Sequence, residues 1–253
     1  MLALKKVVGW VSKQRQECSM KKLMIGLMVG LTVGLMGFAR AADVSPEQAA
    51  LNAAIAMQIV GGWSNPAPAQ AAFEKVPTDF PAATAEIKAR ARVGIAISLY
   101  RQGKAAEAQA VLEKSLKDYP TVSAACLWNT KHLLVCSLNS QSKYAETQTA
   151  SEDFLKDQPA AFDVRWILWL ALDKQGKISE AQTALMAYVR DNVWTLGAKE
   201  GGAIWRSFEQ ITPATITADV YKQFLSDTLK ATKAVDENAK FLGRIKSELA
   251  KMQ

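Results

Sequence analysis

Apolar residues recur at every third or fourth position along most of the chain, a spacing typical of amphipathic helices. No segment shows the sustained alternation of apolar and polar residues, bounded by turn residues, that marks strands. In the stretch 99–120, LYRQGKAAEAQAVLEKSLKDYP, Gly103 separates two runs of helix-forming residues and Pro120 follows the second. The pattern predicts one helix over 82–102, ended by Gly103, and another over 105–118, stopped by Pro120.

Pro81, Pro120 and Pro159 are equally spaced along the chain, and similar segments precede all three. A fourth copy ends at 185–193 without a proline. A helix-breaking segment lies upstream in each copy: Gly61 and Gly62, Gly103, residues 139–143, and Gly176. Each period therefore predicts a helical hairpin. A single hairpin cannot bury both of its faces, so the copies are expected to stack.

This pattern resembles the tetratricopeptide repeat (TPR) over roughly residues 45–195. When the late proline of the family's frame of about 34 residues is set on Pro120, Gly103 occupies the turn and Ala108 the tight helix crossing. The segment 173–185, DKQGKISEAQTAL, is the best match in the chain. The resemblance implies an all-α fold, a TPR-like αα-hairpin solenoid (a right-handed superhelix) with C-terminal capping helices. The interval between the three prolines is longer than the family's frame and implies longer first helices or longer links.

After residue 195 the repeat frame is lost. Residues 195–211 are interpreted as a helix weakened by Gly201 and Gly202, and two further helices follow. The apolar side of the first is expected to carry Val220, Phe224, Leu225 and Leu229, and that of the last Phe241, Leu242, Ile245, Leu249 and Met252. We interpret residues 196–253 as a cap. The alternative is an amphipathic surface for a partner, and these helices are also a candidate site of homo-oligomerisation.

Residues 20–41 have the pattern of a secretory signal. Met-Lys-Lys at 20–22 precedes an uncharged apolar run over 23–39, and the small residues Ala39 and Ala41 flank Arg40. We expect translation to begin naturally at Met20 and cleavage to follow Ala41. The predicted division is therefore a presequence (1–41), TPR-like repeats (42–195) and capping helices (196–253). The protein is expected to be exported to the periplasm or the extracellular space, with membrane contact only if the presequence stays uncleaved.

The excess of positive charge belongs mainly to the presequence. The whole chain holds 31 basic and 24 acidic residues, and removal of residues 1–41 takes away seven basic residues and one acidic residue. The remaining 24 basic and 23 acidic residues nearly cancel. This balance favours an evenly mixed surface and argues against nucleic acid as a partner.

Residues suited to catalysis are scarce. His132 is the only histidine, and no glycine-rich phosphate loop or nucleophile motif is present. Cys126 and Cys136, ten residues apart on one expected helix, would lie about 15 Å apart, too far for a disulfide. We expect two free, buried thiols and a partly exposed His132, with no metal, cofactor or enzymatic activity.

The resemblance also implies a binding face, because TPR proteins contact ligands mainly through their first helices. The corresponding residues are Arg90, Tyr100, Arg101, Asn129, His132, Asn139, Asp163, Trp166, Asp173 and Lys174. The expected function is a non-catalytic scaffold or adaptor of the periplasm or envelope that binds a protein or peptide on this concave face. The alternative is an all-α envelope enzyme or binder acting on glycan or peptidoglycan. The tryptophans fit either a packed core or a carbohydrate platform.

Overall fold

The computed structural model describes residues 44–211, 213–232 and 238–252, and the predicted presequence lies outside these ranges. Residues from Glu47 onward form one compact unit. The described residues contain eleven α-helices, one short 3-10 helix and no strand, which confirms the all-α prediction. In chain order these are α2 (Pro46–Gly61), α3 (Ala67–Asp79), α4 (Ala85–Arg101), α5 (Ala105–Asp118), α6 (Ala124–Ser140), α7 (Tyr144–Asp157), α8 (Phe162–Lys174), α9 (Ile178–Leu196), α10 (Ala203–Glu209), η1 (Pro213–Thr215), α11 (Ala218–Ala231) and α12 (Ala239–Ala250).

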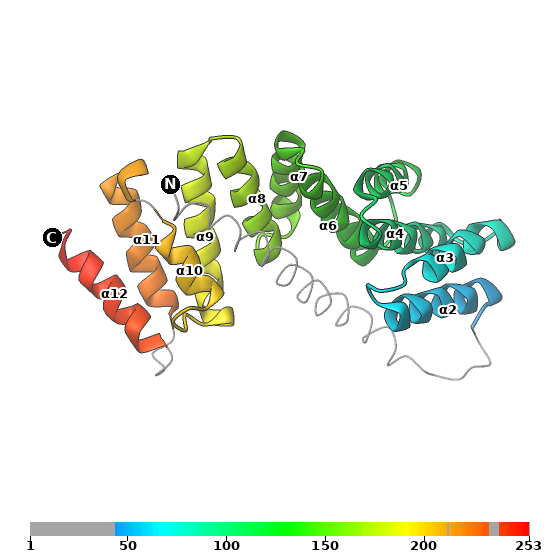
Figure 1. Ribbon diagram of the computed structural model, residues 1–253, viewed down its shortest axis with the longest axis horizontal. Helices are drawn as coiled ribbons and strands as arrows, with labels where there is room; N and C mark the ends of the chain where they lie inside the picture. The colour runs from blue at the N-terminus through cyan, green and yellow to red at the C-terminus, as the bar shows by residue number, and fades with distance from the viewer. Residues whose placement is uncertain (1–43, 212, 233–237, 253) are drawn as a thin grey trace. The chain divides into compact units, whose positions relative to one another are not determined.

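Consecutive helices form antiparallel hairpins (Figure 1). In each hairpin we call the first helix A (α2, α4, α6, α8) and the second helix B (α3, α5, α7, α9). Helix α6 contacts α5 and α7 and also the neighbouring A helices α4 and α8. Each internal A helix thus packs between two B helices, and the A helices form a continuous layer. This stacking confirms the predicted TPR-like solenoid.

The turns and caps recur as the sequence period requires. Gly103 and Gly176 adopt φ values of 77° and 73° in the A-to-B turns, and Ser142 takes the same place with φ 60°. Each B helix before a repeat proline is followed by one residue outside the helical conformation, because proline disfavours that conformation in the residue that precedes it. These residues are Phe80, Tyr119 and Gln158, with φ of −124°, −133° and −134°.

The unusually long interval between the repeat prolines is explained mainly by longer A helices, as the sequence predicted. Helices α4 and α6 each contain 17 residues, whereas α8 contains 13. The link 119–123 is also one residue longer than the link 158–161. Together these differences account for the excess of the period over the family's frame. The predicted helix 82–102 begins only at Ala85, because the Thr84 side chain caps it by accepting the Ile87 N–H.

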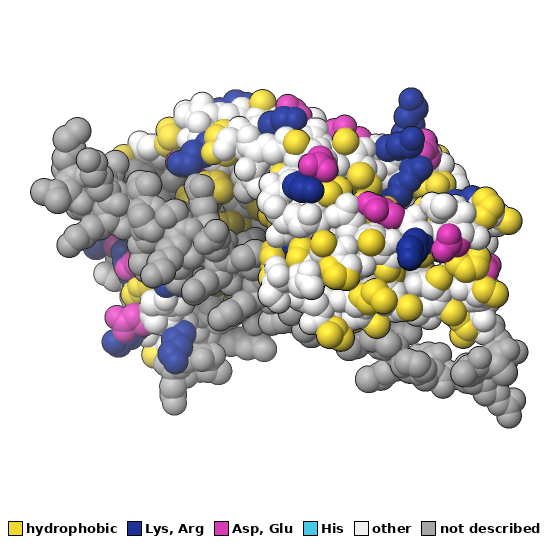
Figure 2. Space-filling view, turned by 45° about the vertical axis from the view of Figure 1, so that its right-hand side comes forward, with side chains coloured by type: hydrophobic (Ala, Val, Ile, Leu, Met, Phe, Trp, Pro, Cys, Tyr) yellow, Lys and Arg dark blue, Asp and Glu magenta, His cyan; other side chains and the backbone are white. Residues whose placement is uncertain are grey.

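An ion pair joins helix A to helix B at the same place in three successive hairpins. The pairs are Arg92–Asp118 (2.6 Å), Lys131–Asp157 (3.0 Å) and Arg165–Asp191 (3.1 Å). All are open to solvent on at least one side, so each stabilises the fold only weakly. Figure 2 shows basic and acidic side chains interspersed on the face it presents, in keeping with the expected mixed surface.

Glutamines connect each hairpin to the next. The C-cap glutamine of an A helix donates its amide N–H to a glutamine in the preceding B helix: Gln102 to Gln70 (2.5 Å), Gln141 to Gln109 (2.9 Å) and Gln175 to Gln148 (3.1 Å). Lys143 and Lys177 donate to the same acceptors, Gln109 and Gln148. We call these contacts the glutamine ladder. The short helix α10 continues it, because Gln182 of α9 donates to the carbonyl of the α10 C-cap, Gln210.

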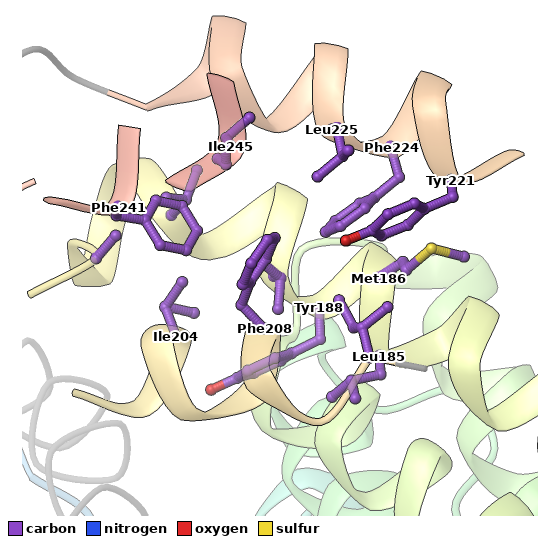
Figure 3. Packing of buried hydrophobic residues seen from close by; sticks show 14 residues of the cluster. Leu185, Met186, Tyr188, Ile204, Phe208, Tyr221, Phe224, Leu225, Phe241 and Ile245 are labelled. Carbon is purple, nitrogen blue, oxygen red and sulfur yellow. The ribbon is translucent and has the colours of Figure 1, made fainter. Parts of the chain in front are cut away.

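The structure corrects two details of the predicted C-terminal part. Gly201 and Gly202 precede helix α10 instead of interrupting a helix over 195–211, and α9 continues to Leu196. Val220 is 47% exposed, whereas its neighbour Tyr221 is buried. The buried side of α11 is therefore Tyr221, Phe224, Leu225 and Thr228. Figure 3 shows Phe224 and Leu225 meeting Phe208, Phe241 and Ile245 in the core formed with α9, α10 and α12.

Replacing Gly94 by alanine should destabilise the first two hairpins. A Cβ atom at Gly94 would lie 2.5 Å from the ring of Phe73, which is 1% exposed and has no room to move. Overpacking of this kind typically costs about 1–3 kcal/mol. Gly243→Ala in α12 is the matched control: the new Cβ meets no atom within 4 Å, and the change should stabilise by about 0.5–1 kcal/mol. Urea unfolding of both variants checks this, and an unchanged midpoint for Gly94→Ala would contradict the close packing.

Replacing Ser142 by glycine should stabilise the protein by a few tenths to about 1 kcal/mol, because the left-handed backbone conformation is unfavourable for residues with a Cβ. The exposed 3.2 Å hydrogen bond from Tyr144 would be lost, at little cost. The mirror experiment is Gly103→Ala, where φ is 77° and the Cβ would meet no atom. That variant should lose about 1 kcal/mol through backbone strain alone. The melting temperatures of the two variants should shift in opposite directions relative to the wild type. A shift in the same direction would contradict this explanation.

Candidate binding face

All ten residues predicted for the binding face lie on three adjacent A helices, α4, α6 and α8. They occupy three equivalent positions of the repeat. Near the beginning of each helix lie Arg90, Asn129 and Asp163, and one turn further lie His132 and Trp166. In the last turn lie Tyr100, Asn139 and Asp173, with Arg101 and Lys174 beside them. Because α4 contacts α6 and α6 contacts α8, these positions form rows across the layer of A helices. We call this surface the A-helix face.

The side chain of Arg101 binds the C-terminal end of α2. Its Nη1 donates to the carbonyls of Gln58 (3.0 Å) and Gly62 (3.1 Å), and its guanidinium lies 5.1 Å from the centre of the Trp63 ring. Burial lowers the pKa of Arg101. These carbonyls belong to the last turn of α2 and the residue after it, which need donors. Arg101 therefore acts as a C-terminal cap of the first A helix.

Tyr100 joins α4 to α6. Burial raises the pKa of its hydroxyl well above the usual range, and the Ser140 hydroxyl is its hydrogen-bond partner. Tyr100 keeps a partly exposed edge. It therefore stays un-ionised and presents an aromatic surface between two A helices.

His132 and Asp163 join α6 to α8. The Nε2 of His132 lies 2.6 Å from a carboxylate oxygen of Asp163, and its ring stacks on Trp128 with centroids 4.9 Å apart. His132 is only 4% exposed, so the prediction of a partly exposed histidine is wrong. Burial alone would raise the pKa of Asp163, but the hydrogen bond from His132 and its charge outweigh that effect and lower it. The pair links two repeats: His132 is closed to a ligand, whereas the side chain of Asp163 is 36% exposed but already paired.

The two thiols are buried, and both are free, as predicted. Burial raises the pKa of Cys126 to about 11. Burial also raises the pKa of Cys136, where the nearby Asp163 carboxylate adds to the effect. Neither sulfur is a thiolate near neutral pH, so neither is activated as a nucleophile or metal ligand.

Trp166 takes part in packing. Its ring centroid lies 4.4 Å from that of Trp169 and 5.6 Å from that of Tyr188, and both tryptophans border the C-terminal core. Trp169 packs against the cluster of buried residues that α9 forms with the helices that follow. Half-buried rings in these contacts are poorly placed to form a flat platform.

Five of the predicted residues remain accessible and are not committed to contacts between helices. They are Arg90, Asn129 and Asn139, which are half-buried, and Asp173 and Lys174, whose side chains are 42% and 41% exposed. The Asn139 Oδ1 and the Arg101 Nε are buried and have no hydrogen-bond partner among the described residues. Buried polar atoms without partners are rare in folded proteins.

Within the described ranges, no group of three or more His, Cys, Asp or Glu side chains is arranged to hold a metal ion. Among the helices of these same ranges, none combines the length and apolarity needed to cross a membrane.

Comparison with known proteins supports the fold class alone. No family model matches the chain, and no curated protein matches it. A solved structure described as "MamA RS-1 ArsTM double mutant" is similar with a TM-score of 0.52 and 13% identity, over 74% of this chain and 96% of that one. Another, "MamA AMB-1 C2221", has a TM-score of 0.47 and 20% identity, over 73% of this chain and 96% of that one. The chain is thus an all-α, TPR-like helical-repeat protein.

The His132–Asp163 pair should make stability depend on acid pH. The pKa of Asp163 is lower in the folded protein, so its stabilising contribution is complete above the unfolded value, near pH 4, and is lost as pH falls through the folded pKa. In Asp163→Asn that contribution is absent at every pH. Urea midpoints measured from pH 6 downward should therefore fall more steeply for the wild type than for the variant below about pH 4. Parallel curves would show that the pair is not linked to folding.

Proposed function

We propose that this protein is a non-catalytic scaffold of the periplasm or envelope that binds a protein or peptide through the A-helix face. The observation that carries the proposal is that accessible polar side chains recur at two repeat positions, each on two adjacent A helices. Arg90 and Asn129 occupy the first position, and Asn139 and Asp173 the second, with Lys174 beside it. Regularly spaced donors and acceptors suit the repeating carbonyl and N–H groups of a peptide.

The chemistry of the face favours hydrogen bonding to a peptide. Arg90 and Lys174 are donors, Asp173 is an acceptor, and the side-chain amides of Asn129 and Asn139 provide both functions. The aromatic edge of Tyr100 lies beside the second row and offers apolar contact. Tyrosine and arginine are common among the residues that dominate interface energies.

Export is part of the proposal and rests on the sequence of residues 20–41. The nearly balanced charge of the remaining chain and the absence of a reactive thiol among its described residues are compatible with an exported scaffold. Mass spectrometry of the protein purified from cells tests this directly. A mature N-terminus at Ala42 is expected, whereas a protein that retains residues 20–41 would contradict cleavage.

The glycan alternative has weaker support. A carbohydrate platform needs exposed aromatic rings, and Trp166 and Trp169 instead pack on each other and on the C-terminal core. A tryptophan-fluorescence titration with muropeptides should therefore give no saturable change. A saturable change abolished by Trp166→Ala would favour glycan over a peptide.

Charge reversal on the A-helix face should abolish partner recovery. In Arg90→Glu/Lys174→Glu, two donors of the face become acceptors, and a loss of about 1.4 kcal/mol or more would lower affinity at least about tenfold. The measurement is quantitative recovery of bound proteins from an envelope extract of the source organism. Arg101 and His132 are unsuitable for this test, because their replacement would disturb the contacts between helices.

The matched control is Lys117→Glu/Lys156→Glu, which makes the same change of net charge on the B helices α5 and α7. Both residues are exposed and lie in the last turns of their helices, at equivalent repeat positions. The control should recover partners as the wild type does. Equal recovery of partners by the A-helix variant and the wild type would contradict the proposal that this face binds the partner.

A further inference from the structure

Exposed apolar side chains gather on the first helix. Eight large hydrophobic residues are exposed in the described part of the chain, and three of them lie on α2. They are Met57, Ile59 and Val60, with exposed fractions of 49%, 42% and 88%. Figure 2 shows hydrophobic side chains gathered at the end of the described chain that α2 and α3 form. Such a concentration is unusual for a surface that faces only water.

The outward side of α2 has the pattern of a helix that packs on another helix. Ala49, Ala53, Ala56 and Val60 follow one another at spacings of four, three and four residues, and all are exposed. This is the spacing of a helix–helix seam, and small residues in it allow close approach. The opposite side, with Leu51, Ala54 and Gln58, is buried against the rest of its unit. We call the exposed set the α2 seam.

Charge is absent from the α2 seam but present on the last helix. Glu47, in the first turn, is the only charged residue of α2. By contrast, the exposed residues of α12 and its C-cap are largely basic: Lys240, Arg244, Lys246 and Lys251. A solenoid in water needs polar outer faces on both terminal units. Helix α12 meets that requirement, and α2 does not.

The chain that remains after export is too short to cover the seam. This step rests on the proposed cleavage after Ala41, which leaves residues 42–45 ahead of α2. Four extended residues reach about 14 Å. Helix α2 contains 16 residues and is about 24 Å long. Another molecule is therefore needed to bury it.

We propose that a second copy of this chain covers the seam, so that α2 packs antiparallel on α2 of the partner. An isologous contact places the same patch on both sides, and a charge-free patch meets its copy without repulsion. Antiparallel packing also keeps the two Glu47 side chains at opposite ends of the contact. The C-terminal helices considered in the sequence analysis are less suited to this role, because Phe241 and Ile245 of α12 are fully buried in their own core.

The test measures molecular mass by light scattering on the purified protein, after mass spectrometry has identified its N-terminus. The wild type is expected to be a dimer, and Ala53→Glu/Ala56→Glu, with both changes in the α2 seam, a monomer of half that mass. Glutamate is a good helix former, so both exposed substitutions should leave α2 intact. The control is Val220→Glu, which places one glutamate on an exposed apolar residue of α11 and should remain dimeric; it matches the single variant Val60→Glu in charge.

A wild type that stays monomeric at about 100 μM would overturn the proposal, as would a dimer that survives both glutamates. Circular dichroism and thermal melting show whether the double variant folds. If it does not, Val60→Glu at the most exposed position provides the same test. The partner-recovery experiment reports on the A-helix face separately, and the determined N-terminus reports on cleavage. A result that contradicts the proposed dimer can thus be told apart from one that contradicts the proposed function.

Discussion

The junction between successive hairpins is the contact on which the rest of the structure depends. A helical hairpin buries one side within itself and leaves the other exposed until a neighbour covers it. Ala108 and Leu112 of α5 are completely buried, which shows how tightly the B helix is enclosed. The glutamine ladder crosses the same junction, and in it the largely buried Gln109 finds partners in Gln141 and Lys143. Apolar packing holds the hairpins together, and the satisfied amides fix their register, since an amide left unpaired there would be costly.

The sequence predicted the parts of the fold that depend on local chemistry. Gly103 forms a turn and Pro120 follows the end of a helix, because their backbone restrictions act within one or two residues. The turn and the helix end lie at the predicted places. Depth of burial was less predictable, because it depends on residues far along the chain. His132 is buried because Trp128 stacks on it and Asp163, 31 residues later, pairs with it. On α11, the choice between Val220 and Tyr221 turns on one helical position, and only packing against α9 and α12 decides it.

The candidate site shows the same limit. Repeat position placed the ten residues on adjacent A helices, but it could not separate residues that remain accessible from those that join the repeats. Arg101 and the His132–Asp163 pair make contacts between helices that stabilise the layer. The glutamine ladder was missed, although QGK or QSK precedes three of the B helices, at 102–104, 141–143 and 175–177. That recurrence is a local signal, and its meaning becomes clear only when the partner glutamines of the preceding B helices are seen beside it.

The position of the accessible residues also bears on how the A-helix face would recognise a partner. Lys174 lies in the last turn of α8, where unpaired carbonyls give the helix end partial negative charge. Its charge is therefore partly neutralised by its own helix, and its Nζ lies 3.9 Å from a carboxylate oxygen of Asp173 as well. Attraction of an acidic partner by net charge is weak in such a setting. Discrimination must instead come from the match of donors and acceptors along the row, which favours a partner that presents extended backbone over one that presents only a charged surface.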